Sequence, residues 1–233
     1  MIGKLVPDLT AALSGLHSGM TVAVSGFGLS SNPEALIDGV LDAGVTDLTL
    51  ISNNAGAMGI GLARWLQAGI VSRVICTYVG SNIDLQRALD DGSVAVDLIP
   101  QGTFVERLRA AGAGLAGFYT PTGVGTVIAA GKEERTFEGR RYLLERALHA
   151  DFALIRAFKA DPFGNVRFWG TSANFAPAMA MAATVAVVEA EQVLPLGGIA
   201  PDDVHLSGGF TQRVLHVPQH ADVIEKRTVR RSP

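Results

Sequence analysis

The fold is decided by the stretch Thr21-Val22-Ala23-Val24-Ser25-Gly26-Phe27-Gly28-Leu29-Ser30-Ser31-Asn32-Pro33. In it, the apolar run at 21–24 is followed directly by a loop of small residues. The run predicts a short buried strand. Pro33 predicts the start of a helix, with Asn32 as its N-cap. A second apolar run, Leu48–Ile51, precedes Ser52-Asn53-Asn54-Ala55-Gly56. Because open α/β sheets bind ligands at the carboxyl ends of their strands, the two loops predict one shared polar cleft.

The first half of the chain alternates between strand and helix patterns. Apolar runs at 74–78 and 94–99 predict two more strands, and apolar residues at helical spacing follow each of the four strands. Strict alternation predicts right-handed crossovers and a parallel sheet covered on both faces. We therefore predict an α/β fold, an open, mostly parallel sheet with helices on both faces.

The second half changes character after a glycine-rich stretch at 111–125. Residues 135–146 predict a hairpin that turns at Glu138-Gly139, so a small β hairpin or sheet is appended to the main sheet. Residues 152–157 and 183–189 predict buried strands, and 193–196 a shorter one. No linker is long enough to separate domains, so we expect a single domain over residues 1–233.

Composition narrows the class of protein. A net charge of −3 argues against nucleic acid as a partner. No signal peptide is visible, and the apolar stretch 176–188 is too short to span a bilayer, so we expect a cytoplasmic protein without membrane contact. The five histidines show no ligand-pair spacing, so no metal is expected. The lone Cys76 lies in an apolar run, as core cysteines do, and the basic stretch 225–231 is expected to be solvated or to pack on a partner.

Three amide side chains follow two of the predicted strands. Asn53 and Asn54 end one strand and Gln101 ends another, while backbone N–H groups of the loop at 25–31 favour an anion or a developing oxyanion. Each feature also has a simpler explanation. The two asparagines could be turn formers, Gln101 could be a helix-start residue, and the loop at 25–31 could be an ordinary βα turn. Ser31 stands where a dinucleotide fingerprint would have its third glycine. Together the amides suit a carbonyl or carboxylate that gains charge during acyl transfer.

The acids and bases of a self-sufficient active site are missing from these loops. The histidines form no triad pattern, and no serine lies in G-x-S-x-G. The sequence therefore indicates half of an active site.

The chain resembles the A (alpha) subunit of family I 3-oxoacid CoA-transferases over essentially its whole length. The segments that carry the resemblance are S-G-F-G-L at 25–29, I-S-N-N-A-G at 51–56, T-Y-V-G-S-N at 77–82, I-P-Q-G-T at 99–103, A-G-A-G at 111–114, F-Y-T-P-T-G-V-G-T at 118–126, D-F-A-L-I-R-A-F-K-A-D at 151–161, G-N at 164–165, N-F-A-P-A-M at 174–179 and E-K-R-T-V-R at 225–230.

The resemblance implies a CoA-transferase/isomerase-like fold and a ping-pong reaction of ketone-body metabolism, in which CoA moves from an acyl-CoA, such as succinyl-CoA, to a 3-oxoacid, such as acetoacetate. A glutamate in an S-E-N-G motif of a B subunit is the nucleophile, and that motif is absent here. CoA is then a substrate, no cofactor is bound permanently, and the assembly is an A2B2 heterotetramer. The implied CoA-binding loop is Ser25, Gly26, Phe27, Gly28, Leu29, Ser30 and Ser31, and the implied supporting catalytic residues are Asn53, Asn54 and Gln101.

Several positions depart from the family pattern. Serines replace the first glycine, the cysteine and the last glycine of the usual G-G-F-G-L-C-G loop, and residues 168–175 lack three cationic positions of F-R-K-x-A-R-N-F. A glutamate common before Asn82 is Ser81. Tyr78-Val79-Gly80 and the basic tail favour the succinyl-CoA:acetoacetate type over a 3-oxoadipate CoA-transferase. The alternative from another class is a non-catalytic ligand-sensing or scaffold protein on the same fold.

Overall fold

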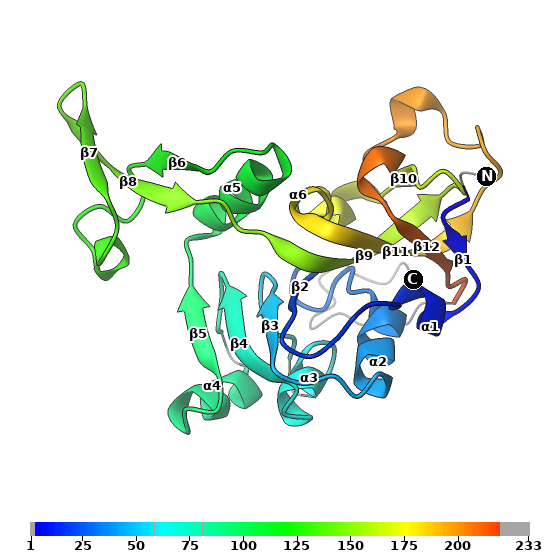
Figure 1. The fold of residues 1–233 in the computed structure, drawn as a ribbon, viewed down its shortest axis with the longest axis horizontal. Helices are drawn as coiled ribbons and strands as arrows, with labels where there is room; N and C mark the ends of the chain where they lie inside the picture. The colour runs from blue at the N-terminus through cyan, green and yellow to red at the C-terminus, as the bar shows by residue number, and fades with distance from the viewer. Residues whose placement is uncertain (1–2, 58, 81, 220–233) are drawn as a thin grey trace, which may run out of the picture.

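The computed structural model describes residues 3–57, 59–80 and 82–219 (Figure 1). Its main sheet has eight strands in parallel, with an antiparallel β10 (Val166–Arg167) beside β9. In spatial order the parallel strands are β1 (Leu5–Val6), β12 (Arg213–His216), β11 (Ala183–Val193), β9 (Ala150–Ala160), β2 (Thr21–Val24), β3 (Leu48–Ile51), β4 (Val71–Cys76) and β5 (Ala95–Leu98). The predicted mostly parallel α/β sheet is confirmed.

Helices cover both faces of this sheet (Figure 1). One face carries α1 (Leu9–Ala12), α2 (Glu34–Asp42), α3 (Ala63–Gln67) and α4 (Ile83–Asp90), and the other carries α5 (Gln101–Gly112) and α6 (Ala176–Ala182). Successive residues of a strand point to opposite faces. In β2, Val22 and Val24 accordingly join the core under α1–α4, while Ala23 joins the core under α5 and α6.

A second, antiparallel sheet extends from the body of the molecule (Figure 1). It has the order β6 (Gly117–Thr120), β8 (Arg140–Arg146), β7 (Glu134–Phe137). Glu138 and Gly139, at φ 49° and 77°, form the two-residue turn between β7 and β8, and two positive φ angles are typical of a type I′ hairpin turn. The predicted appended hairpin is confirmed. Short 3-10 turns lie at η1 (Val127–Ala129), η2 (Gly170–Ala173), η3 (Pro201–Asp203) and η4 (Gly208–Phe210).

Three local predictions are wrong. The strand expected at 74–78 ends at Cys76, because the Thr77 N–H leaves the ladder to bond the Asn53 carbonyl at 3.0 Å. No separate strand exists at 193–196: β11 ends at Val193, and Gly198 N–H bonds the Pro195 carbonyl in a turn. The N-cap of α2 is Pro33 rather than Asn32. None of the helices in the described residues is long and apolar enough to cross a membrane.

Candidate active site

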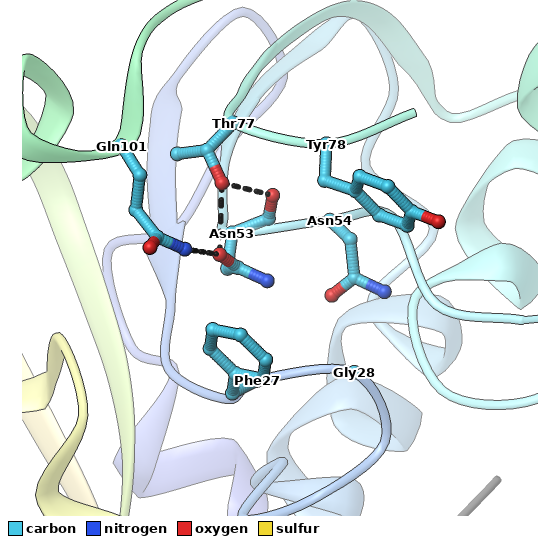
Figure 2. A pocket seen from close by; sticks show the side chains of 7 residues that line it. All are labelled: Phe27, Gly28, Asn53, Asn54, Thr77, Tyr78 and Gln101. Atoms are coloured by element: carbon cyan, nitrogen blue, oxygen red, sulfur yellow. Dashed lines mark hydrogen bonds between the residues drawn. The ribbon is translucent and has the colours of Figure 1, made fainter. Parts of the chain in front are cut away.

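A cavity of about 450 Å³ lies where four strands end, and its lining residues come from the loops after β2, β3 and β4 and from the first residue of α5, which follows β5 (Figure 2). These strands are neighbours in the sheet, so parallel pairing brings the four loops to one edge. The lining residues are Phe27, Gly28, Asn53, Asn54, Thr77, Tyr78 and Gln101. The predicted convergence of the amide side chains is therefore confirmed.

The amide of Asn53 is held from two sides. Its Oδ1 accepts a hydrogen bond from Thr77 Oγ1 at 2.8 Å and another from Gln101 Nε2 at 2.9 Å. Asn53 is 3% exposed, and the Thr77 hydroxyl also lies 3.2 Å from the Asn53 backbone carbonyl. With both bonds on its oxygen, this amide turns its Nδ2 donor towards the cavity (Figure 2). The site thus presents a preorganised neutral donor.

The structure gives Gln101 a different contact from the one expected. The sequence suggests that its amide donates to a bound carbonyl, whereas here Nε2 donates to Asn53. Gln101 is also the first residue of α5, as the simpler explanation of a helix-start residue predicts. Gln101 is therefore placed to orient Asn53, with its second amide hydrogen left for another acceptor.

The seven residues of the loop at 25–31 do not form one surface. Phe27 and Gly28 line the cavity, whereas Ser25 and Leu29 are buried at 1% and 4% exposure. The Ser25 hydroxyl accepts the Arg156 N–H of β9 at 3.1 Å and so fastens the loop to the sheet.

A tight turn brings Phe27 to the cavity. Its backbone N–H and carbonyl pair with those of Ser30 at 3.0 and 3.1 Å, and Gly28, at φ 63°, supplies the positive φ angle that such a two-residue turn needs. Ser30 and Ser31 line a separate cavity of about 180 Å³, which includes Trp169 and Ser172. Backbone geometry therefore divides the loop between two cavities.

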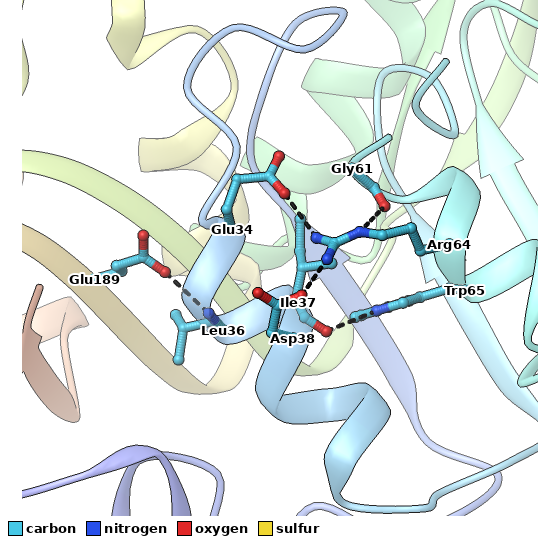
Figure 3. A network of polar contacts seen from close by, with 8 residues as sticks. All are labelled: Glu34, Leu36, Ile37, Asp38, Gly61, Arg64, Trp65 and Glu189. Carbon is cyan, nitrogen blue, oxygen red and sulfur yellow. Dashed lines mark hydrogen bonds and ion pairs between the residues drawn. The ribbon is translucent and has the colours of Figure 1, made fainter. Parts of the chain in front are cut away.

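The amino end of α2 is occupied by a carboxylate of the chain itself (Figure 3). The Leu36 N–H donates to Glu189 Oε2 at 2.9 Å, and Glu189, in β11, is completely buried. The Glu34 N–H bonds the Asn32 carbonyl at 3.1 Å. These two N–H groups at the start of α2 are therefore already paired within the chain.

Beside this junction, Arg64 ties α3 to α2 (Figure 3). It pairs with Glu34 at 2.7 Å and with Asp38, and its Nε donates to the Gly61 carbonyl at 3.2 Å. Burial raises the pKa of the Glu34 carboxyl, and the Arg64 charge opposes that rise. The charges here fix the packing of two helices.

The cysteine and a histidine of the chain have structural roles outside this cavity. Cys76 is fully buried, and burial raises the pKa of its thiol to about 11, so it is the core residue that the sequence indicates. His205 Nδ1 accepts the Phe168 N–H at 3.1 Å. Across the described ranges, no group of three His, Cys, Asp or Glu side chains could hold a metal ion.

Sequence reasoning missed Thr77 and Tyr78 as site residues, since both fell inside the predicted strand at 74–78. It also missed the supporting role of Asn82, which does not line the cavity: its Oδ1 caps α4 at Leu85 N, and its Nδ2 donates to the carbonyls of Ala55 and Gly56 at 2.8 and 2.9 Å. The sequence does carry a signal for Asn82, because an asparagine before an apolar helical pattern predicts an N-cap. Ser81 and the tail at 220–233 lie outside the described residues.

Residues 6–216 match the family described as Coenzyme A transferase. The A subunit of the succinyl-CoA:3-ketoacid coenzyme A transferase of Helicobacter pylori strain J99 is 44% identical over 98% of this chain and 99% of its own length. The A subunit of the 3-oxoadipate CoA-transferase of Pseudomonas putida is 44% identical over 93% of this chain and 95% of its own length. An Escherichia coli O157:H7 acyl-CoA transferase, YdiF, solved as a thioester complex with CoA, has TM-score 0.84 and 20% identity over 95% of this chain.

The chain belongs to the coenzyme A transferase family. It spans 48% of the length of the YdiF chain, a likeness that shows the fold. The resemblance carried by the sequence motifs, the fold class and the enzyme class of CoA-transferase are confirmed.

Proposed function

We propose that this chain is the A subunit of a CoA-transferase that moves CoA from an acyl-CoA, such as succinyl-CoA, to a 3-oxoacid, such as acetoacetate. A separate B subunit supplies the catalytic glutamate, and two A and two B subunits form a heterotetramer in the cytoplasm. CoA is a substrate of this enzyme. The names of the relatives, which are A subunits of enzymes named for 3-ketoacids or 3-oxoadipate, support this proposal.

One observation carries the proposal: every polar side chain that lines the cavity is neutral. Three carboxamides and two hydroxyls line it, and among the described residues at this site there is no carboxylate, histidine or cysteine. Transfer of an acyl group from a thioester through a covalent intermediate needs a nucleophile. This lining supports a half-site to which another chain adds that nucleophile.

In the proposed reaction, the partner's glutamate carboxylate forms a C–O bond to the thioester carbonyl carbon, and the C–S bond breaks to release CoA thiolate. The thiolate then attacks the glutamyl carbonyl of the resulting acyl–glutamyl anhydride, which releases the first acid as its carboxylate and leaves a glutamyl–CoA thioester. The carboxylate of the second acid attacks this thioester and releases CoA thiolate, and the thiolate attacks the acyl carbonyl of the new anhydride to give the product acyl-CoA and the free glutamate. The carbonyl oxygen gains negative charge as each bond forms, and Asn53 Nδ2 is the donor placed to stabilise it. Asn54 assists at the same cavity, and Gln101 orients Asn53. The loop at 25–31 binds CoA, with Phe27 and Gly28 nearest the reacting end.

The test compares the chain alone with the chain co-purified with a partner that carries S-E-N-G. We expect no transfer from succinyl-CoA to acetoacetate by the chain alone, and transfer by the complex. Acetoacetate and 3-oxoadipate are offered in parallel, because this chain is equally identical to a relative named for each kind of acid. Substantial transfer by the chain alone would overturn the half-site. An inactive but assembled complex would favour the scaffold alternative.

A further inference from the structure

One helix supports both walls of the cavity. One wall of the cavity, the amide wall, consists of the side chains of Asn53, Asn54 and Gln101. Gln101, the first residue of α5, bonds Asn53 and so fixes this wall. Three residues later, Phe104 is completely buried and packs edge-on against Phe175, with ring centroids 5.6 Å apart and planes at 86°. This distance and angle are typical of a favourable aromatic pair.

Phe175 in turn supports the aromatic wall. Its ring stacks on that of Phe27, with centroids 6.4 Å apart and planes at 21°. Phe175 is only 9% exposed, whereas Phe27 is 54% exposed and lines the cavity. In Figure 2 the Phe27 ring faces the amides of Asn53 and Gln101. The ring therefore has a supported side and an open side.

The Phe27 ring is not required by the turn that carries it. That turn is closed by backbone bonds between Phe27 and Ser30, and the apolar side chain that the loop buries is that of Leu29. A large apolar ring half exposed beside neutral polar groups gains burial when a ligand covers it.

We propose that Phe27 sets the size of the acyl group that the enzyme accepts, with Phe175 and Phe104 holding its ring in place. This inference rests on the proposed function and names short acyl groups as its substrate class. Because the ring rests on a well-buried partner, it cannot retreat into the protein when the acyl chain grows. A longer chain must then displace the ring or leave the amide wall.

The test uses the assembled enzyme with three acceptor acids: acetoacetate, 3-oxopentanoate and 3-oxohexanoate. We expect the wild type to prefer the shortest acid. Phe27→Ala should raise the ratio of kcat/KM for 3-oxohexanoate over acetoacetate by about 10-fold or more, the size of effect that methylene groups have in an apolar pocket. Phe175→Leu should raise the same ratio less, because it removes the stacked support and leaves the Phe27 ring in place.

The matched control is Phe137→Ala, which removes a 45% exposed ring from β7 in the small sheet. Its chain-length ratio should equal that of the wild type. An unchanged ratio in Phe27→Ala would overturn this inference alone, provided that the wild type transfers CoA. If Phe27→Ala fails to assemble, Phe27→Leu decides: assembly with an unchanged ratio assigns the ring to the partner contact and overturns the inference. A wild-type complex without transfer would overturn the proposed function, and this inference with it.

Discussion

Two polar regions adjoin the loop at 25–31, and they use opposite kinds of side chain. The cavity at the ends of β2–β5 is lined by neutral amides and hydroxyls. At the amino end of α2, which follows the same loop, Glu34 pairs with Arg64, and Glu189 accepts the Leu36 N–H (Figure 3). In the first region the Asn53 Nδ2 donor points into the cavity. In the second region, Glu34 and Glu189 contact other residues of the chain.

The difference suggests that the two regions have separate roles. Buried charges are costly unless they are paired and hydrogen-bonded, so they suit contacts that never change. A neutral amide can accept or donate as charge develops on a ligand, and its fixed orientation adds no reorganisation cost. The amides of the cavity should therefore control rate, and the charges at α2 should control stability.

The largest effect is expected from Asn53→Ala. Removing the donor aimed at the cavity should lower kcat of the assembled enzyme by about 100- to 1,000-fold, or about 2.7–4 kcal/mol of transition-state stabilisation. The melting temperature should change little, because the Thr77 hydroxyl keeps the Asn53 backbone carbonyl as an acceptor and Gln101 is exposed to solvent. Steady-state kinetics and thermal unfolding on one preparation measure both. Gln86→Ala, which removes an exposed amide bonded to Asp90 in α4, is the matched control. A kcat within threefold of wild type would remove Asn53 from the site.

The next effect tests the other side of the comparison. Glu189→Ala leaves the buried Leu36 N–H without its carboxylate acceptor, which should destabilise the chain by about 1–3 kcal/mol. Glu189→Gln keeps an acceptor oxygen and should lose less. Denaturation of the assembled enzyme measures these losses, and kcat of the folded fraction should stay near wild type. Glu191→Ala, at a partly exposed position of the same strand, should change stability by less than about 0.5 kcal/mol. A large kcat loss without destabilisation would reverse the assigned roles.

Local sequence predicted the parts of this fold that local chemistry determines. The bounds of β2 and β3 follow from apolar runs that end in small polar residues, and the β7–β8 turn follows from Glu138-Gly139. Asn53 and Gln101 could be placed together because each follows a parallel strand.

Contacts between distant segments could not be predicted in the same way. Nothing near Glu189 in the sequence indicates that it caps α2, which lies 153 residues earlier. The division of the loop at 25–31 depends on Ser25 reaching β9, 131 residues later. Thr77 became a site residue because β4 ends earlier than its apolar pattern, where its hydroxyl meets Asn53.

A smaller effect is expected from Gln101→Ala. It removes one of the two bonds to Asn53 Oδ1, while Thr77 keeps the other. We expect kcat to fall by about 10-fold, or about 1.4 kcal/mol, with KM for acetoacetate little changed. If Gln101 acts through Asn53, Gln101→Ala should cost almost nothing more in the Asn53→Ala background. Additive losses would instead show that Gln101 contacts the substrate itself.

The smallest effect concerns pH and the Glu34 carboxyl beside Arg64. Burial raises the pKa of Glu34 above its usual value of 4.5, with the Arg64 charge opposing the rise. A carboxyl whose pKa is higher in the folded chain favours folding when protonated. Its contribution is full below pH 4.5 and is lost as the pH rises through the folded pKa. Glu34→Gln cannot titrate, so the melting temperature of wild type minus that of the variant should fall between pH 4.5 and 7. Glu34→Gln also loses the ion pair with Arg64, which shifts the whole curve of this difference against pH. The test therefore uses the slope of the curve and not its height. If the difference rises with pH instead, the pairing of Glu34 with Arg64 lowers the pKa of the carboxyl more than burial raises it. Glu34 and Arg64 would then behave as a surface ion pair.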